Sequence, residues 1–362
     1  MSKMYTADDI MKFSDDEISS ILTNALHKLL SNTDLNTDEM TAVMLIIMQG
    51  RCPDALMGAI LVALRQKGES IDEIAACAKT MIELADTINI NDDKAVDIVG
   101  TGGDGQNLFN ISTAAAFVAA AAGVTIAKHG NRGVSTSSGS SDVLSMAGVK
   151  LDIDINHTRD GINELGVGFL FAPNHHPAMR HAVGVRRQLK VRTIFNVLGP
   201  LTNPALVKRA VIGVFDASLC EPLAQVLANL GYQHALVVHS SDGLDEYSIA
   251  GNTQVAELKD GQISTYHTAP TDVGIQIQSL QGLQVPSSKA SLDIIQAALA
   301  GDSDDPIITK AQAIIAINAG AAIYVSGQAD SHQAGVAKAF EVLASGQALD
   351  KLQAFAKFTQ QF

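Results

Sequence analysis

Two short segments of the chain collect the residue types that bind phosphate groups. The first is Gly-Thr-Gly-Gly-Asp at 100–104, which follows the apolar run Ala-Val-Asp-Ile-Val and precedes Asn-Ile-Ser-Thr at 110–113. A glycine-rich turn between a strand and a helix lets backbone N–H groups approach phosphate oxygens, and the helix N-terminus adds partial positive charge. The side chains of Asn110, Ser112 and Thr113 are able to cap that helix or to donate to an anion. Alone, the pattern fits a phosphate site and a plain turn equally well.

The second segment, KHGNRGVSTSSGSSD at 128–142, follows the next apolar run. It gathers cations, amides, hydroxyls and glycines in one connection between a predicted strand and a predicted helix. The side chains suited to neutralise phosphates or to hydrogen-bond them are Lys128, Asn131, Arg132, Ser135, Thr136 and Ser140. A flexible serine-rich loop is the alternative interpretation, and the fixed strand–loop–helix context favours the ligand site. Neither segment matches the dinucleotide fingerprint or a Walker loop, because GxGxxG is not met in register and no Gly-Lys-Ser/Thr follows.

A pair of adjacent carboxylates, Asp245 and Glu246, ends the segment DGLDE beyond a third apolar run. Mg²⁺ is usually bound by one or two carboxylates together with substrate phosphates and water. An isolated Asp-Glu pair is ordinarily a solvated turn, so only the surrounding motifs favour a metal site. The neighbouring histidines His175 and His176 lack a third ligand at a recognisable spacing, and we do not interpret them as metal ligands.

Acidic residues are unevenly distributed in this chain, whose net charge is −13. None occurs within 105–141 or within 165–215, and the second window holds seven basic residues, Arg186 among them. Segments cleared of acids in an acidic chain indicate contact with a polyanion; an apolar core with a solvated basic face is the alternative. A guanidinium such as that of Arg186 is costly to bury unless an anion arrives. Net negative charge and the absence of Trp argue against nucleic acid as a partner.

The elements that must position these residues follow from periodicity. Capping-box pairs at Ser14–Glu17, Asn36–Glu39 and Ser70–Glu73 predict three helix starts, Gly68 predicts a helix end, and no strand is expected before about residue 90. Short apolar runs then occur at 95–100, 125–130, 168–172, 210–215 and 235–240. They alternate with helices beginning near 112 and 140, which predicts an α/β fold with a mostly parallel central sheet flanked by helices. Residues 247–267 predict a short antiparallel addition, and helices resume from about 290.

Composition also limits where the protein acts. We find no run of about 18 or more apolar residues flanked by polar segments, so we predict no membrane span. The first ten residues carry acids where a secretory signal has a basic segment. The three cysteines, Cys52, Cys77 and Cys220, are far apart and predict neither disulfides nor a CxxC site. We therefore expect a cytoplasmic protein.

Taken in order, these motifs resemble those of the anthranilate phosphoribosyltransferases. The matching motifs are GTGGD with NIST, KHGNR with SGSSD, HPAMRHAVGVR with RTIFNVLGPLTNP at 176–204, and DGLDE, and the resemblance runs through the whole chain. It implies transfer of the phosphoribosyl group from phosphoribosyl pyrophosphate to the amine of anthranilate, a step of tryptophan biosynthesis. It also implies a small helical domain at 1–90 with a return near 180–200, a large α/β domain at 91–362, and a homodimer formed through the small domain.

The resemblance further assigns the site. Phosphoribosyl pyrophosphate would be bound by Gly100, Gly103, Asp104, Asn110, Ile111, Ser112, Thr113, Lys128, His129, Gly130, Asn131, Arg132, Gly133, Val134, Ser135, Thr136 and Ser140. Mg²⁺, two ions per site with substrate bound, would be held by Ser112, Asp245 and Glu246. Anthranilate would contact Gly100, Asn131 and Arg186. No covalent nucleophile or general base is assigned. Leu108 and Gly184 depart from the family pattern, where Thr and Pro are common, and would affect affinity more than activity.

Two rival functions remain open from the sequence. A pyrimidine nucleoside phosphorylase shares the plan, but it carries a Ser-Gly-Arg-Gly-type loop where this chain has KHGNR. A non-catalytic paralogue that binds nucleic acid would be basic and would have lost its metal ligands, whereas this chain is acidic and keeps Ser112, Asp245 and Glu246. Loss of anthranilate fluorescence in a mixture with Mg²⁺ and phosphoribosyl pyrophosphate distinguishes all three.

Overall fold

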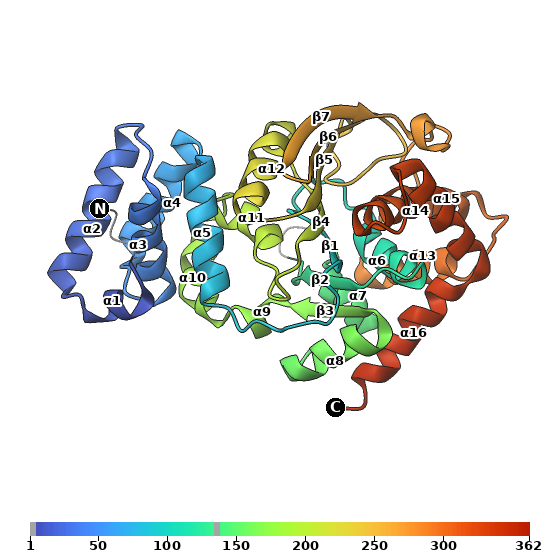
Figure 1. The fold of residues 1–362 in the computed structure, drawn as a ribbon, viewed down its shortest axis with the longest axis horizontal. Helices are drawn as coiled ribbons and strands as arrows, with labels where there is room; N and C mark the ends of the chain where they lie inside the picture. The colour runs from blue at the N-terminus through green and yellow to red at the C-terminus, as the bar shows by residue number, and fades with distance from the viewer. Residues whose placement is uncertain (1–4, 134–137) are drawn as a thin grey trace. The chain divides into compact units, whose positions relative to one another are not determined.

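The chain divides into two compact units. The structure, a computed structural model, describes residues 5–133 and 138–362 (Figure 1). Unit 1 comprises residues 1–87 and 175–202, and unit 2 comprises residues 88–174 and 203–362. The chain therefore passes between the units three times.

Unit 1 is helical, as predicted. Its elements are α1 (Ala7–Lys12), α2 (Asp15–Leu30), α3 (Thr37–Met48), α4 (Asp54–Lys67), α5 (Ile71–Glu83), η1 (Pro177–Met179), α10 (Arg180–Leu189), α11 (Phe195–Leu198) and η2 (Gly199–Leu201). The three predicted capping boxes are confirmed at the starts of α2, α3 and α5. Gly68 ends α4 at a φ of 86°, a left-handed value that favours glycine. Helix α3 is buried almost throughout and forms the centre of this unit.

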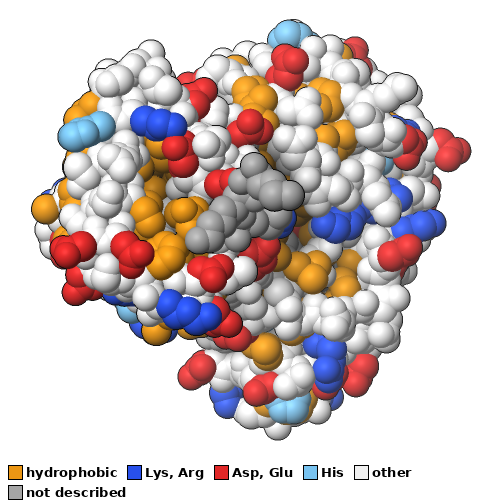
Figure 2. Space-filling view, turned by 60° about the vertical axis from the view of Figure 1, so that its left-hand side comes forward, with side chains coloured by type: hydrophobic (Ala, Val, Ile, Leu, Met, Phe, Trp, Pro, Cys, Tyr) orange, Lys and Arg blue, Asp and Glu red, His pale blue; other side chains and the backbone are white. Residues whose placement is uncertain are grey.

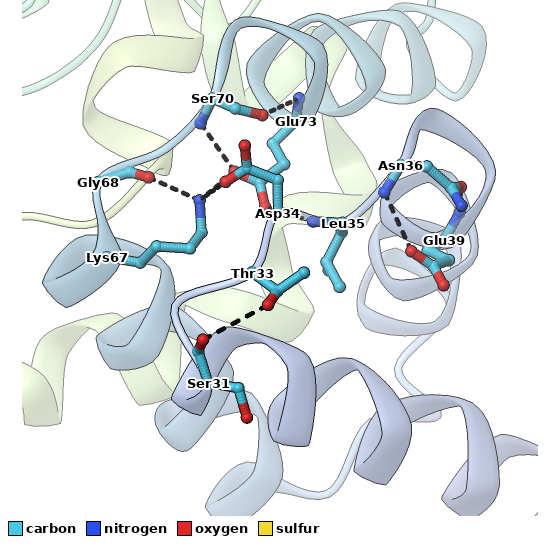
Figure 3. A network of polar contacts seen from close by, with 10 residues as sticks. All are labelled: Ser31, Thr33, Asp34, Leu35, Asn36, Glu39, Lys67, Gly68, Ser70 and Glu73. Carbon is cyan, nitrogen blue, oxygen red and sulfur yellow. Dashed lines mark hydrogen bonds and ion pairs between the residues drawn. The ribbon is translucent and has the colours of Figure 1, made fainter.

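One buried carboxylate fastens two loops of unit 1 (Figure 3). Glu73 is 0 % exposed, and its Oε1 accepts the N–H of Leu35 at 2.9 Å. Its Oε2 accepts the N–H of Ser70 at 2.7 Å and a hydrogen bond from Lys67 Nζ at 2.9 Å. Lys67 pairs in turn with Asp34 at 2.6 Å. The loop before α3 and the loop before α5 are therefore held by the same side chain.

Unit 2 is built on a seven-stranded sheet in the order β3-β2-β1-β4-β5-β6-β7. The strands are β1 (Val96–Gly100), β2 (Ile126–Gly130), β3 (Val167–Phe171), β4 (Arg209–Gly213), β5 (His234–Ser240), β6 (Thr253–Lys259) and β7 (Gln262–Thr268). The first five pair in parallel, and β6 and β7 add antiparallel strands, which confirms the predicted sheet. Asp260 and Gly261, with φ of 50° and 78°, make the tight turn between β6 and β7.

Helices cover both faces of the sheet in unit 2. They are α6 (Ile111–Ala121), α7 (Ser140–Met146), α8 (Ile155–Leu165), α12 (Cys220–Asn229), α13 (Ser288–Leu299), α14 (Pro306–Ser326), α15 (His332–Ser345) and α16 (Gln347–Thr359), with short turns α9 (Ala172–His175), η3 (Ala217–Leu219) and η4 (Pro270–Val273). Helices α6 and α14 pack on each other and on β1, whereas α12 packs on β5 and β6 from the other side (Figure 1). The carboxyl ends of β1, β2 and β5 carry the three predicted phosphate and metal motifs.

Helix α14 corrects the prediction that no apolar run is long enough to span a membrane. By length and composition alone, residues 306–326 pass that test, and 72 % of the most apolar window is buried inside the structure. Every residue from Ala311 to Ile323 is buried, which is the pattern of a core helix. Two of these buried residues, Gln312 and Asn318, are polar.

A second buried carboxylate stabilises the β6–β7 edge of unit 2. Glu257 on β6 accepts hydrogen bonds from His234 Nε2 at 2.9 Å, Tyr324 OH at 2.7 Å and Tyr266 OH at 2.9 Å. Burial raises the pKa of Glu257, but the hydrogen bonds from these three side chains outweigh it and lower the pKa to about 2. Strands β5, β6 and β7 and helix α14 are therefore joined through one ionised group.

The surface and the cysteines agree with the sequence interpretation. Acidic side chains are spread over the face drawn in Figure 2, as a net charge of −13 requires. Cys52, Cys77 and Cys220 are free and buried, which confirms that they form no disulfide.

Candidate active site

The glycine-rich turn after β1 lies against the predicted metal loop. Gly102 and Gly103 have φ of 67° and 81°, so the turn requires residues without a Cβ. The N–H of Gly102 donates to Asp245 Oδ2 at 2.7 Å. A Cβ on Gly100 would lie 2.5 Å from the same carboxylate oxygen. Two motifs that are more than a hundred residues apart in the chain are therefore neighbours in unit 2.

The N-terminus of α6 already holds a carboxylate. The N–H of Ser112 donates to Glu246 Oε1 at 3.1 Å, where the partial positive charge of the helix favours an anion. Asn110 stands at the N-cap position, but its side chain makes no capping hydrogen bond. Instead, Asn110 Oδ1 accepts hydrogen bonds from Ser138 Oγ at 2.7 Å and Ser291 Oγ at 2.8 Å. Asn110 thus ties the start of α6 to the second predicted loop and to α13.

Lys128 connects β2 with this helix start. Its side chain is buried, and Nζ donates to the backbone oxygen of Ile98 and to Ser112 Oγ, the latter at 3.2 Å. Burial lowers the pKa of Lys128, and the charges of Asp97 and Glu246 partly oppose that effect. Lys128, Ser112 and Glu246 consequently form one connected polar group.

Asp97 on β1 links the end of β2 to Asn203 through hydrogen bonds. This fully buried residue accepts the N–H of His129 at 3.0 Å and the Nδ2 of Asn203 at 2.8 Å. The same Asn203 amide donates to the backbone oxygen of Ala127 at 2.8 Å. Burial raises the pKa of Asp97 to about 6 against the opposing charge of Lys128. Sequence reasoning missed Asp97 and Asn203, although an acid inside the apolar run 95–100 is a signal for a buried polar network.

The second predicted loop is closed by an acid that sequence reasoning also overlooked. Asp142 Oδ2 accepts the N–H of Gly133 at 3.0 Å and that of Gly139 at 3.1 Å. The backbone oxygen of Asn131 accepts a hydrogen bond from Ser140 Oγ at 3.3 Å. Both ends of the loop are therefore brought together at the start of α7.

The other predicted residues of this loop occupy different environments. Arg132 is exposed, and its guanidinium lies 5.7 Å from the centroid of the Phe171 ring. Gly130 packs against the Phe169 ring, where a Cβ would approach to 2.6 Å. Val134, Ser135 and Thr136 lie outside the described residues.

Ile111 and Thr113, predicted to contact the phosphoribosyl group, point into the interior of unit 2. Ile111 is 1 % exposed and belongs to the hydrophobic core. Thr113 is equally buried, and its Oγ1 has no hydrogen-bond partner among the residues that the structure describes. Their backbone N–H groups at the helix start are the atoms available to a ligand.

The carboxyl groups of Asp104, Asp245 and Glu246 lie close together, and the single positive charge of Lys128 does not balance all three. Burial, with repulsion from Asp104, raises the pKa of Asp245 to about 6. Burial, with repulsion from Asp245, raises the pKa of Glu246 to about 8. Glu246 Oε2 is buried and has no hydrogen-bond partner among the described residues. These are the properties of oxygen atoms arranged to receive a cation.

The donor set fits Mg²⁺. Asp245 and Glu246 supply hard carboxylate oxygens, and Ser112 supplies a hydroxyl beside them. Within 5–133 and 138–362 no cluster of three or more His, Cys, Asp or Glu side chains has the geometry of a metal cage. Mg²⁺ does not need one, because it commonly binds one or two carboxylates and completes its shell with water and phosphate.

Arg186 belongs to unit 1, on α10. It is half-buried, and its guanidinium lies 5.1 Å from the centroid of the Phe195 ring. Burial lowers the pKa of Arg186, and no described carboxylate pairs with it. The departure at Gly184 changes no packing there, since a Cβ would meet nothing within 4 Å. The other departure, Leu108 in unit 2, forms a β-bridge with Gln284.

The two adjacent histidines have structural partners in unit 1. His175 Nδ1 lies 2.7 Å from the backbone oxygen of Asp86, and His176 Nε2 lies 3.0 Å from that of Thr202. Burial lowers both pKa values, that of His176 to about 4. They fasten the returning segment rather than face a common ligand.

Comparison with known proteins identifies the family. A model of the glycosyl transferase family, a/b domain, matches residues 92–349, and one of the helical bundle domain of that family matches residues 23–85. The anthranilate phosphoribosyltransferase of Psychrobacter sp. strain PRwf-1 is 56 % identical over 364 residues, covering 99 % of each chain. The chain belongs to the anthranilate phosphoribosyltransferase family. This confirms the predicted class of enzyme, a pentosyltransferase of tryptophan biosynthesis, and disfavours both rival functions.

Solved anthranilate phosphoribosyltransferases share the fold. The structure of the Thermus thermophilus protein, TrpD, has 40 % identity and a TM-score of 0.87, covering 93 % of this chain and 99 % of that one. A Saccharomyces cerevisiae structure in complex with PRPP and Mg has 27 % identity and a TM-score of 0.85, covering 95 % and 99 %. The same yeast enzyme in complex with 4-fluoroanthranilate has 27 % identity and a TM-score of 0.85, covering 96 % and 99 %.

Proposed function

We propose that this chain binds phosphoribosyl pyrophosphate and anthranilate and forms N-(5-phosphoribosyl)anthranilate and pyrophosphate with the residues assigned above. The observation that carries these assignments is the connected group of Lys128, Ser112 and Glu246, which joins three separate motifs in unit 2. The yeast relative supports this class of ligand, because it has been solved in complex with PRPP and Mg and in complex with 4-fluoroanthranilate.

The phosphates would be bound by backbone and side-chain donors of unit 2. Backbone N–H groups of the turn at 100–105 and of the start of α6 would donate to phosphate oxygens. Lys128 would supply positive charge, and the second loop would contribute amides and hydroxyls. Mg²⁺, as two ions held by Asp245, Glu246 and Ser112 and by the diphosphate, would supply the positive charge that stabilises departing pyrophosphate.

The reaction exchanges one bond at the ribosyl carbon. The bond from C1 to the pyrophosphate oxygen breaks, the bond from C1 to the anthranilate nitrogen forms, and the amine loses one proton. An aryl amine is a weak nucleophile, so orientation matters, and well-positioned reactants gain about 7–11 kcal/mol. Arg186 would pair with the carboxylate of anthranilate, and Asn131 and Gly100 would contact the same substrate.

A direct assay tests the activity. Purified protein is mixed with Mg²⁺, phosphoribosyl pyrophosphate and anthranilate, and the loss of anthranilate fluorescence is followed while pyrophosphate is measured separately. We expect both signals to change in equal amounts and to require Mg²⁺. Consumption of anthranilate without stoichiometric pyrophosphate, or no consumption at all, would contradict the proposal.

The metal assignment has its own test. The double variant Asp245→Asn/Glu246→Gln removes both charges with little change in volume, so the Mg²⁺ concentration giving half-maximal activity should rise. Asp260→Asn is the matched control, because this turn residue is exposed and its φ of 50° suits Asn as well as Asp. An unchanged Mg²⁺ titration in the double variant would reject these ligands.

We also propose the homodimer that the resemblance implies. Helices α2, α4 and α10 of unit 1 line an apolar groove of about 670 Å³. Leu30 and Val62 at this groove are 69 % and 44 % exposed, and burial against a second copy would remove them from water. Val62→Glu should yield monomers in light scattering, whereas Ile277→Glu, at an exposed apolar residue of unit 2, should not. Dimers of undiminished stability in the Val62 variant would refute this interface.

The cytoplasm is the location consistent with this activity. All three cysteines are free thiols, as in proteins kept in a reducing compartment. A fusion to a fluorescent protein, imaged in living cells, tests the location; signal confined to the envelope would contradict it.

A further inference from the structure

The loop that carries the two proposed metal ligands is clamped at its next residue by a buried amide. Tyr247 follows Glu246, and its N–H donates to Asn318 Oδ1 at 3.0 Å. The Nδ2 of Asn318 donates back to the Tyr247 oxygen at 2.9 Å. The N–H and the carbonyl oxygen of Tyr247 are thus both held by the side chain of Asn318. Asn318 lies on α14 and is 2 % exposed.

The orientation of the Asn318 amide is fixed by its own helix. Its second Nδ2 hydrogen donates to the backbone oxygen of Ile314, one turn earlier in α14, at 2.9 Å. Both N–H groups are therefore used, and Oδ1 accepts the Tyr247 N–H. An amide inside an apolar helix is costly unless its hydrogen bonds are made. The clamp on Tyr247 accounts for a polar residue at this position of the core.

The clamp acts directly on the conformation of Glu246. The Tyr247 N–H belongs to the peptide that links the two residues, so holding it fixes the backbone beyond the Glu246 Cα. On the other side of the loop, the Asp245 backbone oxygen packs so closely on Gly213 that a Cβ there would overlap it. The carboxylate pair is therefore confined between the end of β4 and the middle of α14.

The Tyr247 side chain is buried against α15. Its ring is 0 % exposed and lies 4.6 Å from the ring of His332, centroid to centroid. His332 Nε2 in turn lies 2.8 Å from the backbone oxygen of Ile317, the residue before Asn318. Helix α14 also packs along α6, whose start presents Ser112. One helix thus supports both elements that supply the proposed metal donors.

We infer that Asn318 is a positioning residue for the Asp245–Glu246 metal site. It acts through the backbone of Tyr247 and touches neither substrate nor metal. The inference rests on the proposed function, since it assumes that Mg²⁺ binds these carboxylates. Partners that orient metal ligands typically change metal affinity about 10–100-fold when they are removed.

Asn318→Ala tests the clamp against a matched control. Gln312→Ala also removes a buried amide of α14, one that donates to the backbone oxygens of Ala298 and Gly301 instead. Both variants should lose stability. Only Asn318→Ala should weaken binding of Mg²⁺, measured by calorimetry with pyrophosphate present, by about 10–100-fold, while the KM for anthranilate stays within about twofold of wild type.

A second measurement needs neither substrate nor metal. Hydrogen exchange of peptides covering 241–252 in the metal-free protein should be faster in Asn318→Ala and unchanged in Gln312→Ala. Asn318→Asp, which keeps the acceptor for the Tyr247 N–H and loses the donor to its oxygen, should fall between wild type and Asn318→Ala. If Mg²⁺ affinity or exchange changes equally in the Asn318→Ala and Gln312→Ala variants, the clamp is refuted; if the wild type itself transfers no phosphoribosyl group, the proposed function fails instead.

Discussion

The loss of stability expected on replacing Glu73 can be divided among the separate interactions that this side chain makes. Replacing Glu73 by Ala removes the capping-box carboxylate of α5, the partner of the buried Lys67 and the acceptor of the Leu35 N–H. Losing the cap alone costs about 1 kcal/mol, as for other capping residues. Leaving the Leu35 N–H without its acceptor costs about 1–3 kcal/mol. Losing one partner of Lys67, which keeps its pair with Asp34, costs about 2 kcal/mol, less than for a buried charge left alone. We therefore expect Glu73→Ala to lower the free energy of unfolding of unit 1 by about 4–6 kcal/mol.

Glu17→Ala is the matched control for this prediction. Glu17 forms the same capping box with Ser14 at the start of α2, but the pair is exposed and has no buried lysine. The control should therefore show the cap energy alone, about 1 kcal/mol. The difference between the two variants isolates the buried part of the network in Figure 3.

Native-state hydrogen exchange, followed by mass spectrometry in increasing urea, measures both variants on the full chain. Amides in 35–48 and 70–83 of Glu73→Ala should lose protection by about a thousandfold relative to Glu17→Ala, since about 1.4 kcal/mol corresponds to a factor of ten. Equal loss of protection in the two variants would refute the reasoning, because it would leave no energy for the buried ion pair.

Three further predictions follow from the site and the sheet. Arg186→Ala should raise the KM for anthranilate far more than that for phosphoribosyl pyrophosphate in steady-state assays, and Arg187→Ala, at the exposed neighbour, should change neither; equal effects on both substrates would remove the assigned role. The pKa of Glu257 is lowered from 4.5 to about 2, so above pH 4.5 its ionised form adds roughly 3 kcal/mol to the free energy of unfolding. This contribution is lost as the pH falls toward 2. Acid titrations of stability should therefore be flatter in Glu257→Gln, and curves parallel to wild type would contradict this. Gly213→Ala should displace the Asp245 backbone and weaken Mg²⁺ binding, as calorimetry would show; wild-type affinity would mean that the loop moves freely.

The predictable parts of the fold are those that depend on residues close to one another in the sequence. Capping boxes join residues three positions apart, and strands alternate with helices over short runs, so the helix starts and the succession of strands along the chain could be predicted. The order of the strands within the sheet was not predicted. The error at α14 has a different cause, because the apolar run is visible in the sequence and the prediction overlooked it. Length and apolarity at 306–326 satisfy the test for a membrane span, and only tertiary packing shows that the helix is buried in unit 2.

The candidate site residues could be selected from the sequence by type, and their binding roles stay predictions, whereas the contacts that support them could not be predicted. Gly100, Ser112 and Glu246 could be selected because glycine, hydroxyl and carboxylate suit phosphate and Mg²⁺. The supports escaped because they join residues that are distant in the chain: Ser291 reaches Asn110 across 181 positions, and Asn318 reaches Tyr247 across 71. A polar residue inside an apolar helix was the available signal, and its meaning depends on what packs against it.

The discontinuous build of unit 1 has a consequence for synthesis on the ribosome. Its first five helices emerge early, but α10 and α11 follow only after roughly 90 more residues, a delay of several seconds at about 5–20 residues per second. During that interval the nascent helices lack the segment that completes their bundle, and the faces of α3 and α4 that α10 contacts are uncovered. Chaperones that recognise apolar nascent chains would meet this protein first at its N-terminal helices, well before the catalytic sheet is assembled.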